Sequence, residues 1–338
     1  MRRNGVPAVT ICLPSIGRTT TLNSTLTSLR AQTYPDYEVL VLDNASPAEG
    51  AAVLEGYVKS EPRARMLRSE ERLSMFENFQ RGLDQARGRY VAFFHDDDVY
   101  EPDFIAEHVA VLDAHRKAAV SGSNCLLIDE HGRITSDRAL IAGSEVWSGW
   151  RYIETVFALG NNIFPMQSVV LRREAVPERF FSAADGPHFT DYFLLMRLAE
   201  EHDVGLISDR LLRMRMHPDQ ASRQMAPVES LQLRTRLFNE YCAELERRWP
   251  NRAAEIGGLR KGVAHARRSA AVWMWLFAED SQDAAESRSA LDRRGQDRWL
   301  RWAMTIADRT GLARLVRNGS VQRWLRSAAY SAVARGAR

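Results

Sequence analysis

The 338-residue sequence predicts an α/β domain whose mixed, mostly parallel sheet is flanked by helices, followed by an α-helical C-terminal extension. Three observations support this fold class. Apolar strands alternate with amphipathic helices at the start of the chain, polar clusters follow the strands, and the chain after Pro227 is rich in Arg, Ala and Trp. We therefore expect one domain over residues 1–225, with halves at 1–102 and 103–225, and a helical region at 226–338.

The elements of the first half follow from their hydrophobic periodicity. Residues 8–13 are apolar and β-branched and predict a strand that ends at Pro14, after which Leu22, Leu26 and Leu29 share one face of a helix. The remaining elements of this half are a strand, a helix and a strand, at residues 37–42, 73–86 and 90–94. Because helices connect these strands, the strands should be parallel, and the polar residues that follow them should gather at one edge of the sheet.

The second half has a mixed pattern. We expect a strand at 169–171, a helix at 192–200 and a strand at 204–207.

The helical region carries Trp299, Trp302 and Ile306 on one face, with arginines nearby. We expect this face to pack on the rest of the protein or on a second copy in a homodimer. Contact with an anionic membrane surface is the alternative.

Composition excludes several classes of protein. The 46 basic and 43 acidic residues give a net charge of only +3, so the charge gives no indication of a nucleic-acid partner. Cys12, Cys125 and Cys242 are far apart and form no C-x-x-C pair, which argues against a disulfide framework or a zinc site and favours the cytoplasm. The longest apolar run, 270–278, is too short to span a bilayer. We expect a protein that is soluble or that lies on a membrane surface.

An acidic triplet, Asp96 to Asp98, follows the expected strand at 90–94. Adjacent carboxylates repel one another unless a positive charge lies among them, and a divalent cation with oxygen ligands meets this need. The alternative is a solvated turn or a cap for the helix that starts near Pro102. In an extended chain Asp96 and Asp98 would point one way and Asp97 the other, so they would not be equivalent ligands.

Several motifs in order resemble those of the family 2 glycosyltransferases. The matching segments are Pro14–Arg18 for P-x-x-x-R, Ser28–Gln32, Tyr34–Pro35, Asp43–Ser46 for D-x-x-S, a helix containing Asn78, Ala86–Val91, and Asp96–Asp98 for D-x-D. His95 replaces the usual first Asp of D-x-D and is expected to be an ordinary structural histidine. The resemblance is dense over roughly the first hundred residues and thinner to about Ser222.

This resemblance implies a GT-A fold and a metal-dependent, inverting enzyme. Such an enzyme moves a sugar from a nucleotide diphosphate donor, most commonly a UDP-sugar, to a hydroxyl of a glycan or glycolipid acceptor. Residues 1–102 would bind the nucleotide and 103–225 the acceptor. Bacterial surface polysaccharide or lipopolysaccharide synthesis is the implied pathway, at the inner face of the membrane if the C-terminal helices contact it.

The resemblance also implies roles for individual residues. The residues expected to contact the nucleotide are Pro14, Ser15, Arg18, Asp43, Ser46, Asn78 and Asp96. The residues expected to bind Mg²⁺ or Mn²⁺ are Asp97, Asp98 and His217.

The catalytic base should come from the second half of the domain. Thr190–Leu198 resembles the family segment E-D-x-x-L-x-x-R-L, with Thr190 in place of Glu and Asp191 at the position of the base. A helix N-cap is the alternative role of Asp191. Arg215 and His217 match R-x-H-x-x-x-x-S, and Arg215 is expected to offset phosphate charge.

Two other functions compete with a transferase. A sugar nucleotidyltransferase shares the architecture and the use of metal, but it typically has a Gly-rich loop after the first strand, which Pro14–Arg18 lacks. A non-catalytic carbohydrate-binding or scaffold protein is the other alternative, and the intact Asp43, Asp97 and Asp191 argue against it.

Overall fold

The computed structural model describes residues 6–181, 190–217, 225–276, 281–291 and 297–309. The chain divides into two compact units. The first comprises Met1–Ile153 and Ile163–Pro218, and the second comprises Glu154–Asn162 and Asp219–Arg338.

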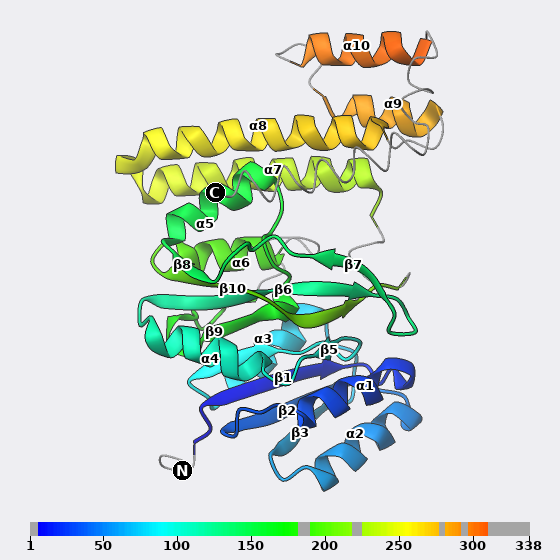
Figure 1. Ribbon diagram of the computed structural model, residues 1–338, viewed down its shortest axis with the longest axis vertical. Helices are drawn as coiled ribbons and strands as arrows, with labels where there is room; N and C mark the ends of the chain where they lie inside the picture. The colour runs from blue at the N-terminus through cyan, green and yellow to red at the C-terminus, as the bar shows by residue number, and fades with distance from the viewer. Residues whose placement is uncertain (1–5, 182–189, 218–224, 277–280, 292–296, 310–338) are drawn as a thin grey trace. The chain divides into compact units, whose positions relative to one another are not determined.

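The first unit begins with four neighbouring parallel strands in the spatial order β3-β2-β1-β4, the first three of which are labelled in Figure 1. These strands are β1 Val9–Ser15, β2 Tyr37–Asn44, β3 Ala64–Ser69 and β4 Tyr90–Phe93. The connecting helices are α1 Thr19–Arg30, α2 Ala48–Ser60 and α3 Met75–Gln85. The parallel order places the carboxyl ends of β1, β2 and β4 at one edge, with Ser15 opposite Asp43 in the register.

Alternation along β1 divides the helices between the two faces of the sheet. Ile11 and Leu13 belong to the core cluster that also contains Leu22 of α1 and Leu54 of α2. Cys12 faces the other side, where its sulfur lies close to Gly82 of α3. A Cβ atom at this glycine would lie 2.6 Å from Leu42 and 3.2 Å from Cys12, so the missing side chain allows α3 to approach the sheet closely.

The sheet continues through mixed strands to a total of ten in the described chain, in the order β4-β9-β6-β10-β5 with β7 and β8 at its margins. These strands are β5 Val99–Tyr100, β6 Ala118–Ile128, β7 Ile134–Arg138, β8 Glu145–Trp147, β9 Val169–Arg172 and β10 Asp203–Arg215. Strand β9 is antiparallel to both β4 and β6, while β10 is parallel to β6. The helices here are α4 Phe104–Ala114 and α6 Thr190–Ala199, with 3₁₀ turns at Met166–Ser168 and Arg173–Ala175. Helix α5 Gly149–Leu159 begins in this unit and ends in residues assigned to the second.

Several features differ from the sequence-based expectation. Strand β1 continues through Pro14 to Ser15. Proline has no backbone N–H to donate, but β4 pairs with β1 only as far as Cys12, so Pro14 has a neighbouring strand, β2, on one side only. Strand β10 is much longer than 204–207. Several elements were not expected from the sequence at all, namely helices α2 and α5 and strands β3, β5, β6, β7 and β8.

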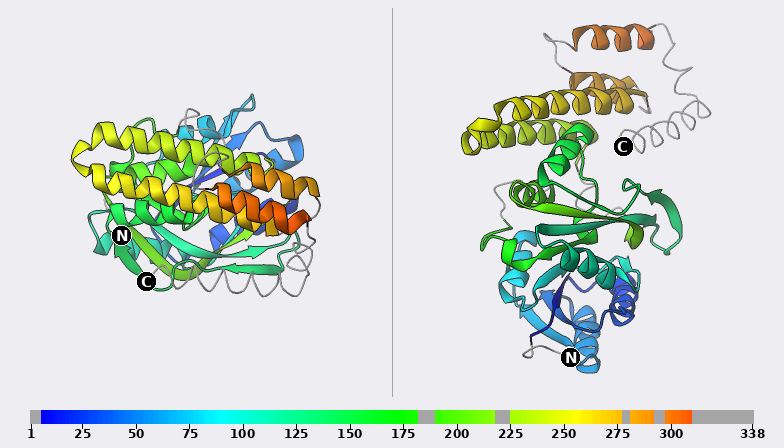
Figure 2. Two further views of the ribbon diagram at one scale, coloured as in Figure 1. Left: turned by 90° about the horizontal axis from the view of Figure 1, so that it is seen from above. Right: turned by 60° about the vertical axis from the view of Figure 1, so that its left-hand side comes forward.

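The second unit is helical and contains α7 Pro227–Arg248, α8 Ala253–Leu276, α9 Ser281–Ser289 and α10 Arg298–Arg309, with a 3₁₀ turn at Pro250–Arg252. Helices α7 and α8 run side by side in both views of Figure 2. The core of this unit includes Leu231 of α7, Trp275 of α8 and Met304 of α10. Within the described residues, none of the helices is both long enough and apolar enough to cross a membrane.

Candidate active site

Asp96 joins the segment after β4 to the end of β1. Its Oδ2 atom accepts hydrogen bonds from Ser15 Oγ at 2.6 Å and from the Ile16 N–H at 3.2 Å, and Arg18 donates to Oδ1 at 3.1 Å. Burial raises the pKa of Asp96, and the charge of Asp97 adds to this, although Ser15 and Arg18 act in the opposite direction. Two residues expected to contact the nucleotide, Ser15 and Arg18, therefore also hold the acidic segment in place.

The acidic residues lie on a tight turn rather than on an extended chain. The N–H of Asp98 approaches the carbonyl oxygen of His95 at 3.4 Å. Because a turn replaces the alternation of a strand, the orientation stated for an extended chain, with Asp96 and Asp98 on one side, does not apply here. Asp97 Oδ2 instead lies 3.0 Å from His217 Nε2, and Asp98 Oδ1 accepts a hydrogen bond from the Arg215 N–H at 2.8 Å.

The turn offers a set of ligand atoms for a cation. One ligand atom from each of His95, Asp97 and Asp98 lies within 4.8 Å of the others. Asp98 Oδ2 is buried and has no hydrogen-bond partner among the described residues. Burial, together with the charge of Asp97, raises the pKa of Asp98 well above its ordinary value, so a bound cation would relieve an unfavourable charge. Carboxylate oxygens suit Mg²⁺ or Mn²⁺, so Asp97 and Asp98 fit a divalent cation of this kind.

His95 is a functional candidate that sequence reasoning treated as structural. Burial lowers its pKa, which favours the neutral imidazole that can bind a metal ion. Its Nε2 atom is buried without a hydrogen-bond partner in the described chain. The signal that could have identified it is its position, since it stands where the family has the first Asp of D-x-D.

Arg215 has a different environment from the one expected. It ends β10 with 4% of its surface exposed, and its guanidinium donates to the backbone carbonyl oxygens of Asp97, Asp129 and Glu130. These contacts direct the guanidinium to backbone oxygens, so they do not support the expected role of Arg215 in offsetting phosphate charge.

Asp43 lies at the end of β2, opposite Ser15 of β1 in the register, and is fully buried. Burial alone would raise its pKa, but hydrogen bonds from Ser46 and Arg68 outweigh this effect and hold the pKa below the ordinary value. Arg68 Nε lies 2.7 Å from Asp43 Oδ2, and the Ser46 N–H lies 3.1 Å from Oδ1. Asp43 is therefore a fixed anion at the carboxyl edge of the sheet.

Asn78 lies on α3 and is buried. Its side-chain oxygen accepts a hydrogen bond from Arg81 at 2.8 Å, and the same Arg81 nitrogen lies 3.2 Å from the carbonyl oxygen of Asp43. Asn78 thus supports the backbone of Asp43 through Arg81, and its direct contact with a nucleotide stays a prediction.

The loop after Pro14 packs closely against the loop after β2. Gly17 has a φ of +75°, and a Cβ atom placed on it would lie 2.8 Å from Ser46 Cβ and 3.0 Å from Gly50 Cα. Glycine is therefore required here both for its backbone conformation and for the close approach. The contact brings the loop that carries Arg18 against Ser46.

Asp191 lies in the first turn of α6, which begins at Thr190, and its side chain is partly exposed. Burial raises its pKa to about 6, while backbone hydrogen bonds and the charge of Arg138 oppose the rise. Arg138 ends β7 opposite Cys125 of β6. Burial raises the pKa of the nearby Cys125 thiol to about 11, with a lowering contribution from Arg138 and a raising one from Asp98.

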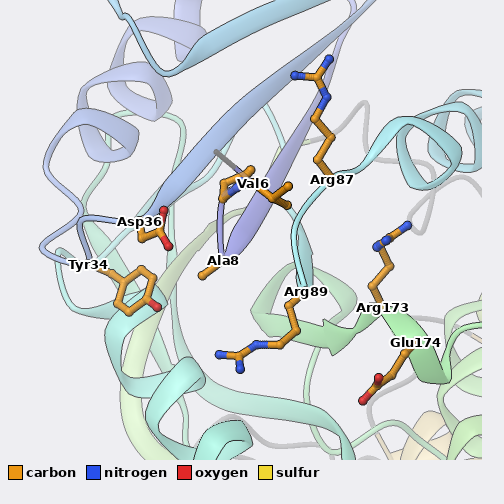
Figure 3. A pocket seen from close by; sticks show the side chains of 9 residues that line it. Val6, Ala8, Tyr34, Asp36, Arg87, Arg89, Arg173 and Glu174 are labelled. Atoms are coloured by element: carbon orange, nitrogen blue, oxygen red, sulfur yellow. The ribbon is translucent and has the colours of Figure 1, made fainter. Parts of the chain in front are cut away.

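A hollow of about 610 Å³ lies at the other end of these strands and does not belong to this site. It is lined by residues that precede β1 and β4, including Ala8, Arg87 and Arg89. Figure 3 shows the guanidinium groups of Arg87 and Arg89 directed away from each other, and Arg89 already pairs with Asp113 at 2.7 Å. These arginines therefore do not converge on one anion.

Comparison with known proteins agrees with this arrangement. The family described as Glycosyl transferase family 2 matches residues 10–180. The putative teichuronic acid biosynthesis glycosyltransferase TuaG of Bacillus subtilis is 26% identical over 129 residues, which are 38% of this chain and 51% of that protein. The chain thus spans about half the length of this curated relative.

Two solved structures share the fold. S. aureus TarS 1-349 in complex with UDP-GlcNAc has a TM-score of 0.60 at 15% identity, covering 95% of this chain and 92% of that one. The mannosyltransferase PcManGT from Pyrobaculum calidifontis, in complex with GDP-Man and Mn²⁺, has a TM-score of 0.56 at 16% identity, covering 98% and 87%. The predicted GT-A fold with a helical C-terminal region is confirmed. Since the family match extends over more than half of the sequence, the chain belongs to glycosyl transferase family 2.

Proposed function

We propose that this protein is an inverting glycosyltransferase that moves a sugar from a nucleotide diphosphate donor to an acceptor hydroxyl. The observation that carries the proposal is the acidic turn at the carboxyl edge of the sheet, where His95, Asp97 and Asp98 place ligand atoms within 4.8 Å of one another. In α/β sheets, ligands bind beyond the carboxyl ends of the strands, which is where this turn lies.

The residues of the turn would hold a divalent cation through Asp97 and Asp98, with His217 and His95 as further ligands. Such a cation neutralises charge on the departing nucleotide diphosphate. Arg18 lies at the same edge, 3.8 Å from Asp97, and is 37% exposed, so its guanidinium can reach a phosphate oxygen. Asp43 and Ser46 would bind the base or the ribose from the end of β2.

Asp191 would act as the general base. Because its side chain is partly exposed and its pKa is near 6, it is mostly ionised at neutral pH and can still accept a proton. The acceptor oxygen gives its proton to the Asp191 carboxylate as it attacks the anomeric carbon from the face opposite the leaving group. The bond to the diphosphate breaks in the same step, so an α-linked donor gives a β-linked product.

We infer a UDP-sugar as the first donor to test and a glycan or glycolipid as the acceptor. UDP-GlcNAc is bound in the TarS structure, whereas GDP-Man is bound in PcManGT, so both nucleotides belong in the test. The name of TuaG supports an acceptor in surface polysaccharide synthesis.

A donor panel tests the proposal. Nucleotide release from UDP-, GDP- and dTDP-sugars should require Mn²⁺ or Mg²⁺, and it should be lost in Asp97→Ala. Asp191→Asn should bind the donor yet fail to transfer the sugar. Release of diphosphate from a nucleoside triphosphate and a sugar 1-phosphate would instead identify a nucleotidyltransferase. Full activity in either variant would contradict the roles proposed for these two residues.

We further propose that α10 contacts an anionic membrane surface, which would bring the enzyme to a lipid-linked acceptor at the inner face of the membrane. Trp302 and Ile306 lie one turn apart on this helix and are 67% and 38% exposed. Sedimentation with vesicles that contain anionic lipid should fall when both are changed to Ser. Ile134→Ser is the matched control, since Ile134 is 61% exposed but lies in β7. Loss of dimer mass with unchanged vesicle binding would identify a homodimer surface instead.

A further inference from the structure

Arg215 connects four segments around the acidic turn. Its Nε donates to the carbonyl oxygen of Asp97 at 2.8 Å, and one terminal nitrogen donates to the carbonyl oxygens of Asp129 and Glu130, each at 2.9 Å. The other terminal nitrogen lies 3.5 Å from Ser24 Oγ on α1. One side chain at the end of β10 thus ties together the acidic turn, the turn after β6 and helix α1.

The main chain of the same residue holds a second part of the turn. The Arg215 N–H donates to Asp98 Oδ1 at 2.8 Å, which leaves Asp98 Oδ2 as the buried oxygen without a partner in the described chain. Backbone and side chain of Arg215 therefore hold adjacent carboxylate residues at two points, Asp98 by its side chain and Asp97 by its main chain.

We propose that Arg215 is a positioning residue that holds the Asp97 and Asp98 carboxylates in the geometry needed to bind a divalent cation. This inference rests on the function proposed above. It differs from a role in binding phosphate, because the guanidinium is directed to backbone oxygens. Partners that orient metal ligands in this way typically change metal affinity by 10–100-fold when they are removed.

Lysine cannot replace arginine at such a site. The guanidinium is a planar fork whose N–H groups point in fixed, different directions, whereas an ammonium group is a single point of charge. A lysine at this position could keep only some of the hydrogen bonds to the carbonyl oxygens of Asp97, Asp129 and Glu130. Arg215→Lys preserves the charge and the backbone N–H, so it isolates the geometric effect of the fork.

The test measures binding of Mn²⁺ alone, by calorimetry and by the electron paramagnetic resonance signal of the free ion. We expect Arg215→Lys to weaken Mn²⁺ binding by about 10-fold or more. The matched control is Arg210→Lys on the same strand, whose partner is Asp137 and whose side chain is 43% exposed. This control should bind Mn²⁺ like the wild type. Asp97→Asn should lose Mn²⁺ binding.

The outcomes separate the inference from the proposed function. If Asp97→Asn binds Mn²⁺ like the wild type, the metal site itself is wrong. If Asp97→Asn loses binding but Arg215→Lys does not, only the role of Arg215 is wrong. Should Arg215→Lys fail to fold, Arg215→Gln replaces it, because an amide at this position can still donate to the Asp97 carbonyl. Loss of folding in both variants would overturn the proposal by making Arg215 a general stabilising residue.

Discussion

The ionisation of Asp191 gives the most direct test of the proposed chemistry. Burial raises the pKa of this carboxyl from 3.8 to about 6. A general base must be ionised to accept a proton, so the rate of transfer should follow the ionised fraction. With a pKa of about 6, that fraction is about nine-tenths at pH 7 and about one-tenth at pH 5. A carboxyl with its ordinary pKa would still be about nine-tenths ionised at pH 5.

The assay is kcat/KM for the acceptor at saturating donor and Mn²⁺, measured from about pH 4.5 to 8. We expect a single acidic limb with a midpoint near pH 6, across which the rate falls about tenfold for each unit of pH. Binding of Mn²⁺ and of the donor must be followed over the same pH range, so that a loss of either ligand is not mistaken for protonation of Asp191.

A second variant links the limb to Asp191. The charge of Arg138 lowers the pKa of Asp191, so Arg138→Gln should move the acidic limb to higher pH. The control is Arg133→Gln, which removes an exposed arginine whose partner is Asp129. A rate that stays on its plateau down to pH 5, or a limb that moves equally in both variants, would refute the assignment of Asp191 as the base.

Three further predictions follow from the same contacts. The folded state holds the Asp191 proton more tightly than the unfolded chain, so the contribution of this group to stability falls as the pH rises from 3.8 to about 6. Asp191→Asn should therefore be more stable than the wild type at pH 7, by up to about 3 kcal/mol in the free energy of unfolding measured with urea. Gly17→Ala should cost more stability than Gly132→Ala, because both have positive φ but only Gly17 has a neighbour, Ser46, within 3 Å of the added Cβ; thermal unfolding of both variants checks this. Asp43→Asn should weaken UDP binding by about tenfold or more in calorimetry, and unchanged affinity would remove Asp43 from the nucleotide site.

The strands that carry the site were predictable because apolar, β-branched runs are a local signal. Strands β1, β2 and β4 lie within one or two residues of their expected ends. Their parallel order then brings Ser15, Asp43 and Asp96 to one edge of the sheet, as the alternation of strands and helices indicated.

The elements that were missed depend on partners distant in sequence. Helix α2 is rich in Ala and Gly, and β3 is a half-buried strand at the end of the sheet order, so neither has a strong hydrophobic pattern. Strand β10 continues through Arg210 and Arg213, which look like loop residues in the sequence. Each pairs with an acid from elsewhere in the chain, Asp137 and Glu101, at 2.9 and 2.6 Å.

The details of the site were also beyond the reach of local patterns. Asp43 was expected to follow its strand, but it lies within the buried end of β2, which is possible because Arg68 from β3 pairs with it. The position of His95 depends on the tight turn after β4, and the sequence offered a turn only as an alternative to a metal site. The environments of Asp43 and His95 could be predicted only if the neighbouring strands and turns were already known.

The charges around the turn explain why a cation is the natural complement of this site. Arg18 contacts Asp96 and Asp97 from a partly exposed position, and the guanidinium of Arg215 is directed to backbone oxygens instead. Burial therefore still raises the pKa of both Asp96 and Asp98. A site designed only for stability would pair each buried carboxylate, since an unpaired buried charge is costly. In the function proposed above, a bound cation would offset the cost of these buried carboxylates.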